Sequence, residues 1–285
     1  MFNFSMHPVH PYLQPFVSSY CIMEIEHTEI VSNIFTAKTD SVLMFHIGMP
    51  PSKVAIQFDF PNTPTKHYTF YRHQAWLGGM LTEPLMGHMS QKGHYLCAVL
   101  TPFGVHHFLK ESATTLTNHG FSIDTLDLPH SFDVLIDKLH HTHDEKIALQ
   151  LIENELLNYY NELTIPFSLK NISPVTDYIA RQNGMVKITE LEDKFRISRR
   201  WLEKQFLVQV GVSPKEYARV TRFTALLNQV FTDPSVSLNI LLDDFGYYDQ
   251  SHLNKDFNAF TGQTPLVYLT TRPNNLNNMF LKQLE

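Results

Sequence analysis

Cysteine is scarce in this chain. The 285 residues include only two, Cys21 and Cys97, and both lie in apolar stretches. Two cysteines cannot form the disulfide framework that holds many small secreted proteins together. We therefore expect two reduced thiols in a cytoplasmic protein.

Long hydrophobic runs are also missing. No stretch of about 18 apolar residues occurs, so we expect no membrane-spanning helix. The first residues, MFNFSMHPVHPY, lack the basic start and the apolar stretch of a signal peptide. The sequence thus predicts a protein without a membrane partner.

Glycine is scarce as well, with 11 residues in the whole chain. The loops that bind phosphate groups are rich in glycine, so the low glycine content argues against such loops here. The sequence also shows no nucleophile motif and no convincing pair of carboxylates. We expect a protein that is not an enzyme, with no catalytic residues and no cofactor.

The chain as a whole lacks a basic excess, because its net charge is −6. The charge is unevenly distributed, however. Residues 1–169 hold 8 Lys and Arg against 16 Asp and Glu, whereas residues 170–285 hold 14 against 12. Of the 16 histidines, 15 precede residue 170. An acidic, histidine-rich front half and a mildly basic back half indicate two domains with different partners.

The front half has the pattern of short strands followed by helices. Strands are predicted where apolar residues alternate with polar ones or form short runs between turn residues, at 41–48, 53–60, 66–71 and 93–109. From about residue 131 the apolar spacing becomes helical, with Ala148, Ile152, Leu156 and Tyr159 or Tyr160 on one stripe. The pattern predicts a β-rich, barrel-like domain that ends in helices.

The back half predicts helices alone, with clear start and stop signals. Residues 164–174, TIPFSLKNISP, interrupt the helical pattern and are the best candidate for a linker, with Pro174 at the start of the next helix. Ser213 and Glu216 form a capping-box pattern around Pro214. The other predicted caps and stops are Ser198, Ser237, Asp249, Gly184, Gly211, Gly246 and Gly262.

Two short helix pairs with exposed polar residues follow each other in this half. In the second pair, Leu253 and Phe257 form a buried stripe with Phe260, which leaves Gln250, Ser251, His252, Asn254 and Lys255 near the start of the helix. Hydrogen-bonding side chains at this end of a second helix are what contact with base edges in a major groove requires. In the first pair, Leu202 and Phe206 take the core role. Left near the surface are Lys194, Arg196, Arg199, Arg200, Trp201 and Lys204.

Residues 172–270 resemble the DNA-binding domain of the AraC/XylS family of transcription regulators. The resemblance rests on ITELEDKFRISRRWLEKQFLVQVGVSPKEYARVTRF and LNILLDDFGYYDQSHLNKDFNAFTGQTPLVYL, and most specifically on GVSPKEY, GQTPLVY and GYxDQSHxxxxF. It implies two recognition helices that enter successive major grooves. The positions that match base-contacting sites are Arg200, Lys204, Gln250, Ser251 and Lys255. Base or backbone contacts are further expected of Arg199, Trp201, His252, Asn254, Lys194 and Arg196.

The resemblance also implies an α+β protein of two domains. Residues 1–165 would form a β-rich sensing or dimerisation domain, 166–272 the double helix-turn-helix domain, and 273–285 a tail. The implied partners are double-stranded DNA, a small-molecule effector, RNA polymerase and a second copy of the chain. Aromatic side chains of the first domain could line an effector pocket or fill its core: Phe45, Phe58, Tyr68, Tyr71 and Trp76. The helices at 131–162 could pair with a second copy or pack on their own domain.

Two other functions remain open at this point. A metal-dependent barrel enzyme with a nucleic-acid-binding tail would use histidines such as His106, His107 or those of HHTH at 140–143. Adjacent histidines on a strand point to opposite faces, however, so we expect no metal site. An adaptor that uses its helical half to bind protein is the third possibility.

Overall fold

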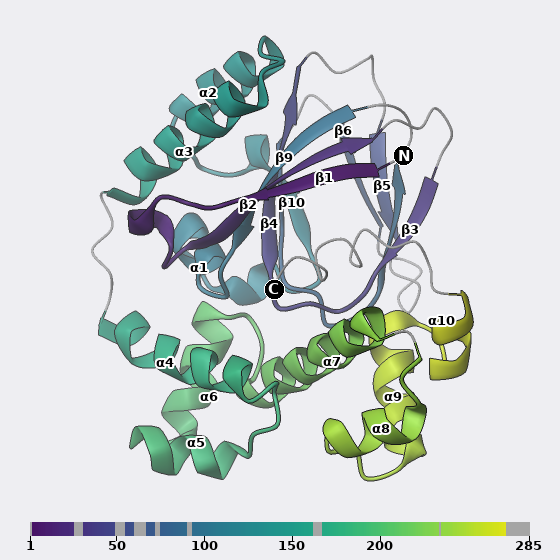
Figure 1. Cartoon of the computed structure of the whole chain (residues 1–285). Helices are drawn as coiled ribbons and strands as arrows, with labels where there is room; N and C mark the ends of the chain where they lie inside the picture. The colour runs from purple at the N-terminus through teal and green to yellow at the C-terminus, as the bar shows by residue number, and fades with distance from the viewer. Residues whose placement is uncertain are drawn as a thin grey trace.

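The computed structural model describes residues 2–25, 31–48, 55–59, 67–71, 75–89, 93–161, 167–233 and 235–271. Strands fill the front half and helices fill the back half, as Figure 1 shows. The predicted α+β class with a helical C-terminal part is therefore confirmed. The expected tail at 273–285 lies outside the described residues.

Six strands form the larger sheet, in the order β1-β2-β9-β4-β7-β10. Each described pairing within it is antiparallel. The central strands β2, β9 and β4 are long and apolar, which suits strands buried on both faces. Their bounds are β1 Phe2–His7, β2 Val17–Ile25, β4 Ser41–Ile47, β7 Trp76–Gly78, β9 Gly93–Leu100 and β10 Gly120–Ser122.

The second sheet has four strands in the order β3-β8-β5-β6, with antiparallel pairing. The strands expected at 53–60 and 66–71 are found here as β5 and β6. The side chains of Phe58, Tyr68 and Tyr71 lie outside the described residues. Of the other two aromatic residues considered, Phe45 is buried in the larger core and Trp76 packs against the smaller one. The bounds are β3 Val31–Phe35, β5 Ala55–Asp59, β6 His67–Tyr71 and β8 Leu85–Met89.

Among the described strands, both sheets are open rather than closed into a barrel. The edge strands β1 and β10 each pair with a single neighbour. Successive residues of β2 point to opposite faces, as a strand requires. Tyr20 and Ile22 join the larger apolar core, whereas Cys21 and Met23 join a smaller core with Cys97 of the adjacent β9. Both cysteines are buried free thiols, as the sequence predicted.

Three helices accompany the sheets: α1 (Gly104–Leu109), α2 (Ser131–His140) and α3 (Glu145–Asn161). Helices α2 and α3 run side by side along the larger sheet (Figure 1). The stripe Ala148, Ile152, Leu156 and Tyr160 is completely buried within the protein's own core. Of the two roles considered for this stripe, packing on its own domain is therefore the one that the structure shows.

The strand predicted at 93–109 is partly wrong. β9 ends at Leu100, and residues 104–109 form α1. Thr101, Pro102 and Phe103 separate the two elements, and proline lacks the N–H that would continue the strand ladder. His106 and His107 therefore lie next to each other on a helix, and the argument from opposite faces of a strand does not apply to them.

The back half consists of helices in the order the sequence predicted. Helix α7 crosses between two helix pairs, α5 with α6 and α8 with α9 (Figure 1). The bounds are α4 Phe167–Arg181, α5 Ile188–Phe195, α6 Arg199–Gln209, α7 Pro214–Thr232, α8 Leu238–Asp244, α9 Gln250–Thr261 and α10 Pro265–Thr271.

The predicted linker at 164–174 is shorter than expected. Helix α4 begins at Phe167, so Pro174 lies inside the helix and not at its start. Proline in this position removes the bond to the carbonyl four residues earlier, which is why the sequence pattern favoured a boundary there. The helix continues because Ile172, Val175 and Ile179 are completely buried in the core, and this burial outweighs the lost bond.

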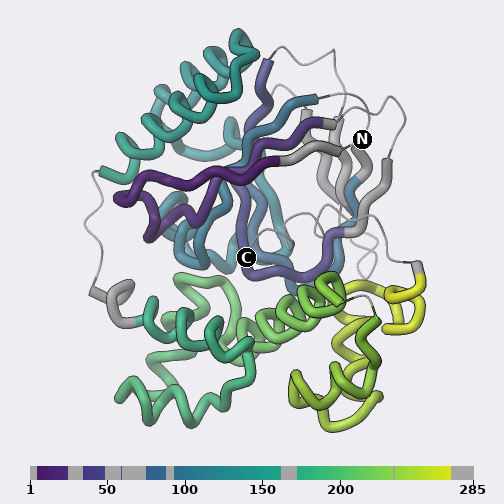
Figure 2. The backbone as a smooth tube through the Cα atoms, in the orientation of Figure 1, coloured from purple at the N-terminus to yellow at the C-terminus, as the bar shows by residue number. Residues whose placement is uncertain are grey.

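The helical part packs directly on the β-rich part, as the tube in Figure 2 shows. The amide of Ala37 donates to the carbonyl of Phe260 at 3.1 Å, and Thr117 Oγ1 donates to the carbonyl of Gly211 at 2.9 Å. The C-terminal ends of α9 and α6 are thus each held against the front half of the chain. Among the described helices, none is both long and apolar enough to cross a membrane.

Candidate nucleic-acid interface

Helices α5 and α6 form the first unit of the candidate interface. The Ser198 hydroxyl accepts from the amide of Trp201 at 3.3 Å and so caps the start of α6. Leu202 and Phe206 are completely buried. Because these two residues fix which face of α6 points inward, Arg199, Arg200 and Lys204 are exposed, as predicted.

Trp201 behaves differently from its charged neighbours. Its side chain is half-buried and packs against the apolar core. Trp201 therefore packs against the core in the structure, whereas its contact with a base stays a prediction.

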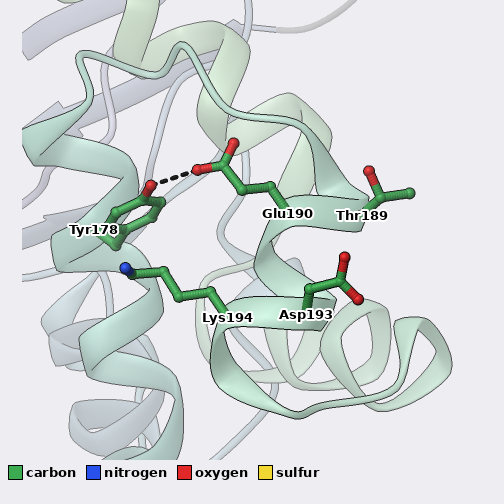
Figure 3. A pocket seen from close by; sticks show the side chains of 5 residues that line it. All are labelled: Tyr178, Thr189, Glu190, Asp193 and Lys194. Atoms are coloured by element: carbon green, nitrogen blue, oxygen red, sulfur yellow. Dashed lines mark hydrogen bonds between the residues drawn. The ribbon is translucent and has the colours of Figure 1, made fainter.

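The cations of α5 lie at the edge of the first unit. Lys194 and Arg196 are exposed, and Arg196 ends the helix in the left-handed region, at φ 55°. Figure 3 shows the ammonium of Lys194 beside the ring of Tyr178 of α4, at 4.6 Å from the ring centre. The Tyr178 hydroxyl donates to the carboxylate of Glu190, in a shallow pocket that Thr189 and Asp193 also line. This cation–π contact holds Lys194 of α5 against α4.

Helices α8 and α9 form the second unit, with the same construction. The Asp249 carboxylate accepts from the amide of His252 at 2.7 Å, which caps the start of α9. Leu253, Phe257 and Phe260 are completely buried, as predicted. Gln250, Ser251 and Lys255 are exposed on the opposite face.

His252 and Asn254 are half-buried, in contrast to these three. The His252 ring lies edge-on to Tyr247, with 5.0 Å between ring centres, and its Nε2 is 3.4 Å from the guanidinium of Arg222. His252 therefore has partners inside the protein.

A buried ionic network behind α9 was missed by the sequence reasoning. Asp256 accepts from Arg219 at 2.8 Å, from Arg222 at 3.0 Å and from the Tyr247 hydroxyl at 2.9 Å. A signal for it was available, because Asp256 lies three residues after Leu253 and four before Phe260. A carboxylate on a buried stripe needs a partner of opposite charge.

The histidines considered for a metal site lie on α1 and at or just after the end of α2. His107 is buried on α1, and His141 lies at the end of α2. Within the part of the chain that the structure describes, no group of three or more His, Cys, Asp or Glu side chains is placed to hold a metal ion.

Comparison with known protein families gives a match within the back half of the chain. Residues 191–271 match the family model described as "Helix-turn-helix domain". Among curated proteins, none matches this chain.

Several solved structures are similar to this chain at low sequence identity. A structure of ToxT from Vibrio cholerae is 11% identical and has a TM-score of 0.48, with 94% of this chain and 98% of that chain covered. ToxT bound to (E)-4-(8-methylnaphthalen-1-yl)but-3-enoic acid has the same identity and coverage, with a TM-score of 0.46. The AraC-like transcriptional activator CuxR is 8% identical over 80% of this chain and 87% of that chain, with a TM-score of 0.28.

The family match covers α6 to α9 with their caps, their buried stripes and the helix that joins them. The resemblance expected from the sequence is thereby confirmed. Residues 191–271 of this chain are an AraC-type helix-turn-helix domain, a DNA-binding module.

Proposed function

We propose that this protein is a sequence-specific transcription regulator whose helices α6 and α9 enter successive major grooves of double-stranded DNA. The observation that carries the proposal is the exposure of polar side chains at the start of both second helices, over completely buried stripes. An arginine can donate two bonds to guanine, and a glutamine can bond adenine in two places. The base-contacting residues in this proposal are Arg200, Lys204, Gln250, Ser251 and Lys255.

The remaining predicted contacts have a supporting role in this proposal. Arg199, Lys194 and Arg196 are exposed cations near the first recognition helix, and we assign them to phosphates. We assign Trp201, His252 and Asn254 to packing around the recognition helices, because all three are half-buried.

The front half has the regulatory role in this proposal. We place the domain boundary near residue 165, with residues 1–165 as the sensing domain and 166–272 as the DNA-binding domain. A small effector or a second copy of the chain would act on the first domain, and the result would be passed to RNA polymerase through the second. A homodimer would use a surface other than the stripe of α3, because that stripe is buried within the chain.

The test is selection of DNA from a random library, followed by substitution of one side chain in each recognition helix. We expect Arg200→Ala and Gln250→Ala each to relax base preference at one position, in different parts of the selected site, at a cost of about 1–3 kcal/mol. Lys194→Ala and Arg196→Ala should weaken binding to all sequences alike and flatten its salt dependence.

Lys146→Ala is the matched control, because Lys146 is an exposed cation on α3 of the front half. Its removal should leave binding and base preference unchanged. If Arg200→Ala and Gln250→Ala both leave binding to the selected site as it was, α6 and α9 are not the recognition helices.

A further inference from the structure

One buried carboxylate ties the second recognition helix to the helix that joins the two units. Asp256 of α9 is 1% exposed, and its two carboxylate oxygens have different partners. One oxygen accepts from Arg219 Nε at 2.8 Å, and the other accepts from Arg222 at 3.0 Å. Both arginines belong to α7, so the contact crosses from one helix to the other at two points one turn apart.

The turn before α9 joins the same carboxylate. The Tyr247 hydroxyl donates to Asp256 at 2.9 Å. Burial raises the pKa of Tyr247, and the nearby charge of Asp256 raises it further, so the hydroxyl keeps its proton and remains a donor. The Arg222 guanidinium lies over the Tyr247 ring at 4.2 Å. Asp256 is thus bonded to groups both on α7 and just before the first turn of α9.

Arg219 is held firmly as a charged partner of Asp256. Burial alone would lower the pKa of Arg219, but its hydrogen bond to Asp256 and the charges of Asp256 and Glu216 outweigh this effect, so the pKa is raised. The Arg219 guanidinium also lies over the Phe260 ring at 4.4 Å. Hydrogen bonds between charged groups in such surroundings are short and directional, and they define an orientation more closely than apolar packing does.

The position of Asp256 on α9 gives these bonds a consequence for DNA. Gln250, Ser251 and Lys255 are exposed on the face away from the buried stripe that Asp256 belongs to. A rotation of α9 about its axis would carry those three side chains away from the bases they contact. The apolar stripe alone tolerates small rotations, because apolar contacts are not directional.

We infer that Asp256 is a positioning residue for base recognition: through Arg219, Arg222 and Tyr247 it fixes the rotation of α9 relative to α7. This inference rests on the proposed function, because it concerns which side chains of α9 face DNA. His252 joins the same set of contacts, since its ring contacts both Tyr247 and Arg222. In the first unit, the buried residues of α6 are Leu202, Phe206 and Gln209. The buried stripe of this helix therefore carries no carboxylate.

The experiment measures base preference position by position for the full chain and its variants, on the DNA site selected by the unaltered protein. Asp256→Asn keeps the shape of the side chain but removes its charge. We expect discrimination at the base pairs contacted by α9 to fall about tenfold or more, the span that one good base contact supplies. Discrimination at the base pairs contacted by α6 should stay within about twofold of that of the unaltered protein.

The salt dependence of binding separates positioning from loss of structure. If α9 is only rotated, its cations still meet phosphates, and the slope of affinity against salt concentration stays as it was. If α9 has unfolded, the slope falls and discrimination at its base pairs is lost together with helical circular dichroism. That second result would overturn the inference, because the carboxylate would then be needed for folding alone.

Tyr247→Phe provides a milder variant that keeps the ring against Arg222 and His252. It removes one bond to Asp256, and we expect a smaller loss of discrimination confined to the same base pairs. Glu216→Gln is the matched control, because Glu216 also contacts Arg219, at 3.3 Å, but is 31% exposed and lies outside the Asp256 contacts. It should leave base preference unchanged.

Two outcomes would contradict the inference while leaving the proposed function intact. One is unchanged discrimination at the α9 base pairs in both Asp256→Asn and Tyr247→Phe. The other is an equal loss at the base pairs of α6 and α9, which would indicate general destabilisation. The proposed function itself would fail earlier and visibly, because the unaltered protein would then select no site.

Discussion

His107 is a buried base inside an apolar part of the front half. Its ring lies edge-on to Phe16, with ring centres 5.2 Å apart, and its side chain is on the buried face of α1. Burial lowers the pKa of His107 to about 4, and the charge of the neighbouring His106 adds to the effect. The folded protein therefore keeps this imidazole neutral at a pH where an ordinary histidine, with a pKa of about 6.5, begins to take up a proton.

The free energy of unfolding should consequently fall in a defined pH range. Between about pH 6.5 and pH 4 the unfolded chain binds a proton at His107 that the folded chain does not bind, so stability is lost as the pH falls. Above this range the contribution is fully present. Denaturant unfolding of the unaltered protein and of His107→Phe at several pH values checks this, and we expect a shallower decline in the variant. Equal slopes would show that His107 does not resist protonation in the folded state.

The individual residues of the interface divide into those that a sequence can predict and those that it cannot. Exposure of Arg200, Gln250 and Lys255 follows from the helical period once Leu202 and Leu253 are assigned to the core. The partners of His252 do not follow from that period, because Arg222 is 30 residues away and meets it through tertiary packing. The His106–His107 pair was misplaced because an apolar run of this length does not distinguish a strand from a strand followed by a short helix.

At the scale of elements, the N-terminal caps explain why the helices begin where they do. Ser198, Ser213, Ser237 and Asp249 each accept from a backbone amide three residues later. Such caps are local in the chain and have strong residue preferences, so the sequence predicted them correctly. The predicted start of α4 was wrong because the true start depends on the burial of Ile172 and Val175. Capping and breaking residues in the nearby sequence do not reveal this burial.

The cap of α9 should contribute measurably to stability. Asp249→Ala removes an acceptor at 2.7 Å, and we expect the free energy of unfolding to fall by about 1 kcal/mol. Ser237→Ala at the start of α8 removes a longer bond, of 3.4 Å, and should cost less. Thermal or denaturant unfolding of both variants makes the comparison. A larger loss in Ser237→Ala would contradict this ranking of the caps.

At the scale of the whole molecule, the two halves meet where α6 ends. Gly211 follows α6 with φ +95°, a conformation that side chains rarely adopt. A Cβ there would lie 2.5 Å from Thr117 Oγ1 and 2.9 Å from the carbonyl of Ala113, both in the front half. The contact is close because the turn backbone of one half fits against the other half without a side chain between them.

Gly211→Ala should therefore cost more than an ordinary substitution of a helix-ending glycine. The matched control is Gly262→Ala after α9, where φ is +71° but the nearest atom across the contact, Pro84 Cγ, is 3.6 Å away. We expect about 1–2 kcal/mol of backbone strain in both variants. Steric overlap should add about 1–3 kcal/mol in Gly211→Ala. Equal losses in denaturant unfolding would show that the halves do not meet at Gly211 in solution.

The uneven charge of the chain also acts at this scale. The helical half is only mildly basic, so nonspecific attraction to phosphates is modest, and in the proposed function specific base contacts supply much of the affinity. The difference in charge between the two halves could be predicted from the sequence. The packing of the front half on α6 and α9 could not be predicted, because contacts such as that of Thr117 with Gly211 join residues that are far apart in the chain.

Selection of bound DNA from a random library by the full-length protein tests the central proposal most directly. If α6 and α9 both contact bases on one face of the duplex, the selected site contains two short conserved blocks about one helical turn, 10–10.5 base pairs, apart. Arg200→Ala should then alter one block and Gln250→Ala the other. A library from which no sequence is enriched, or a single block that neither substitution alters, would contradict recognition of DNA by these two helices.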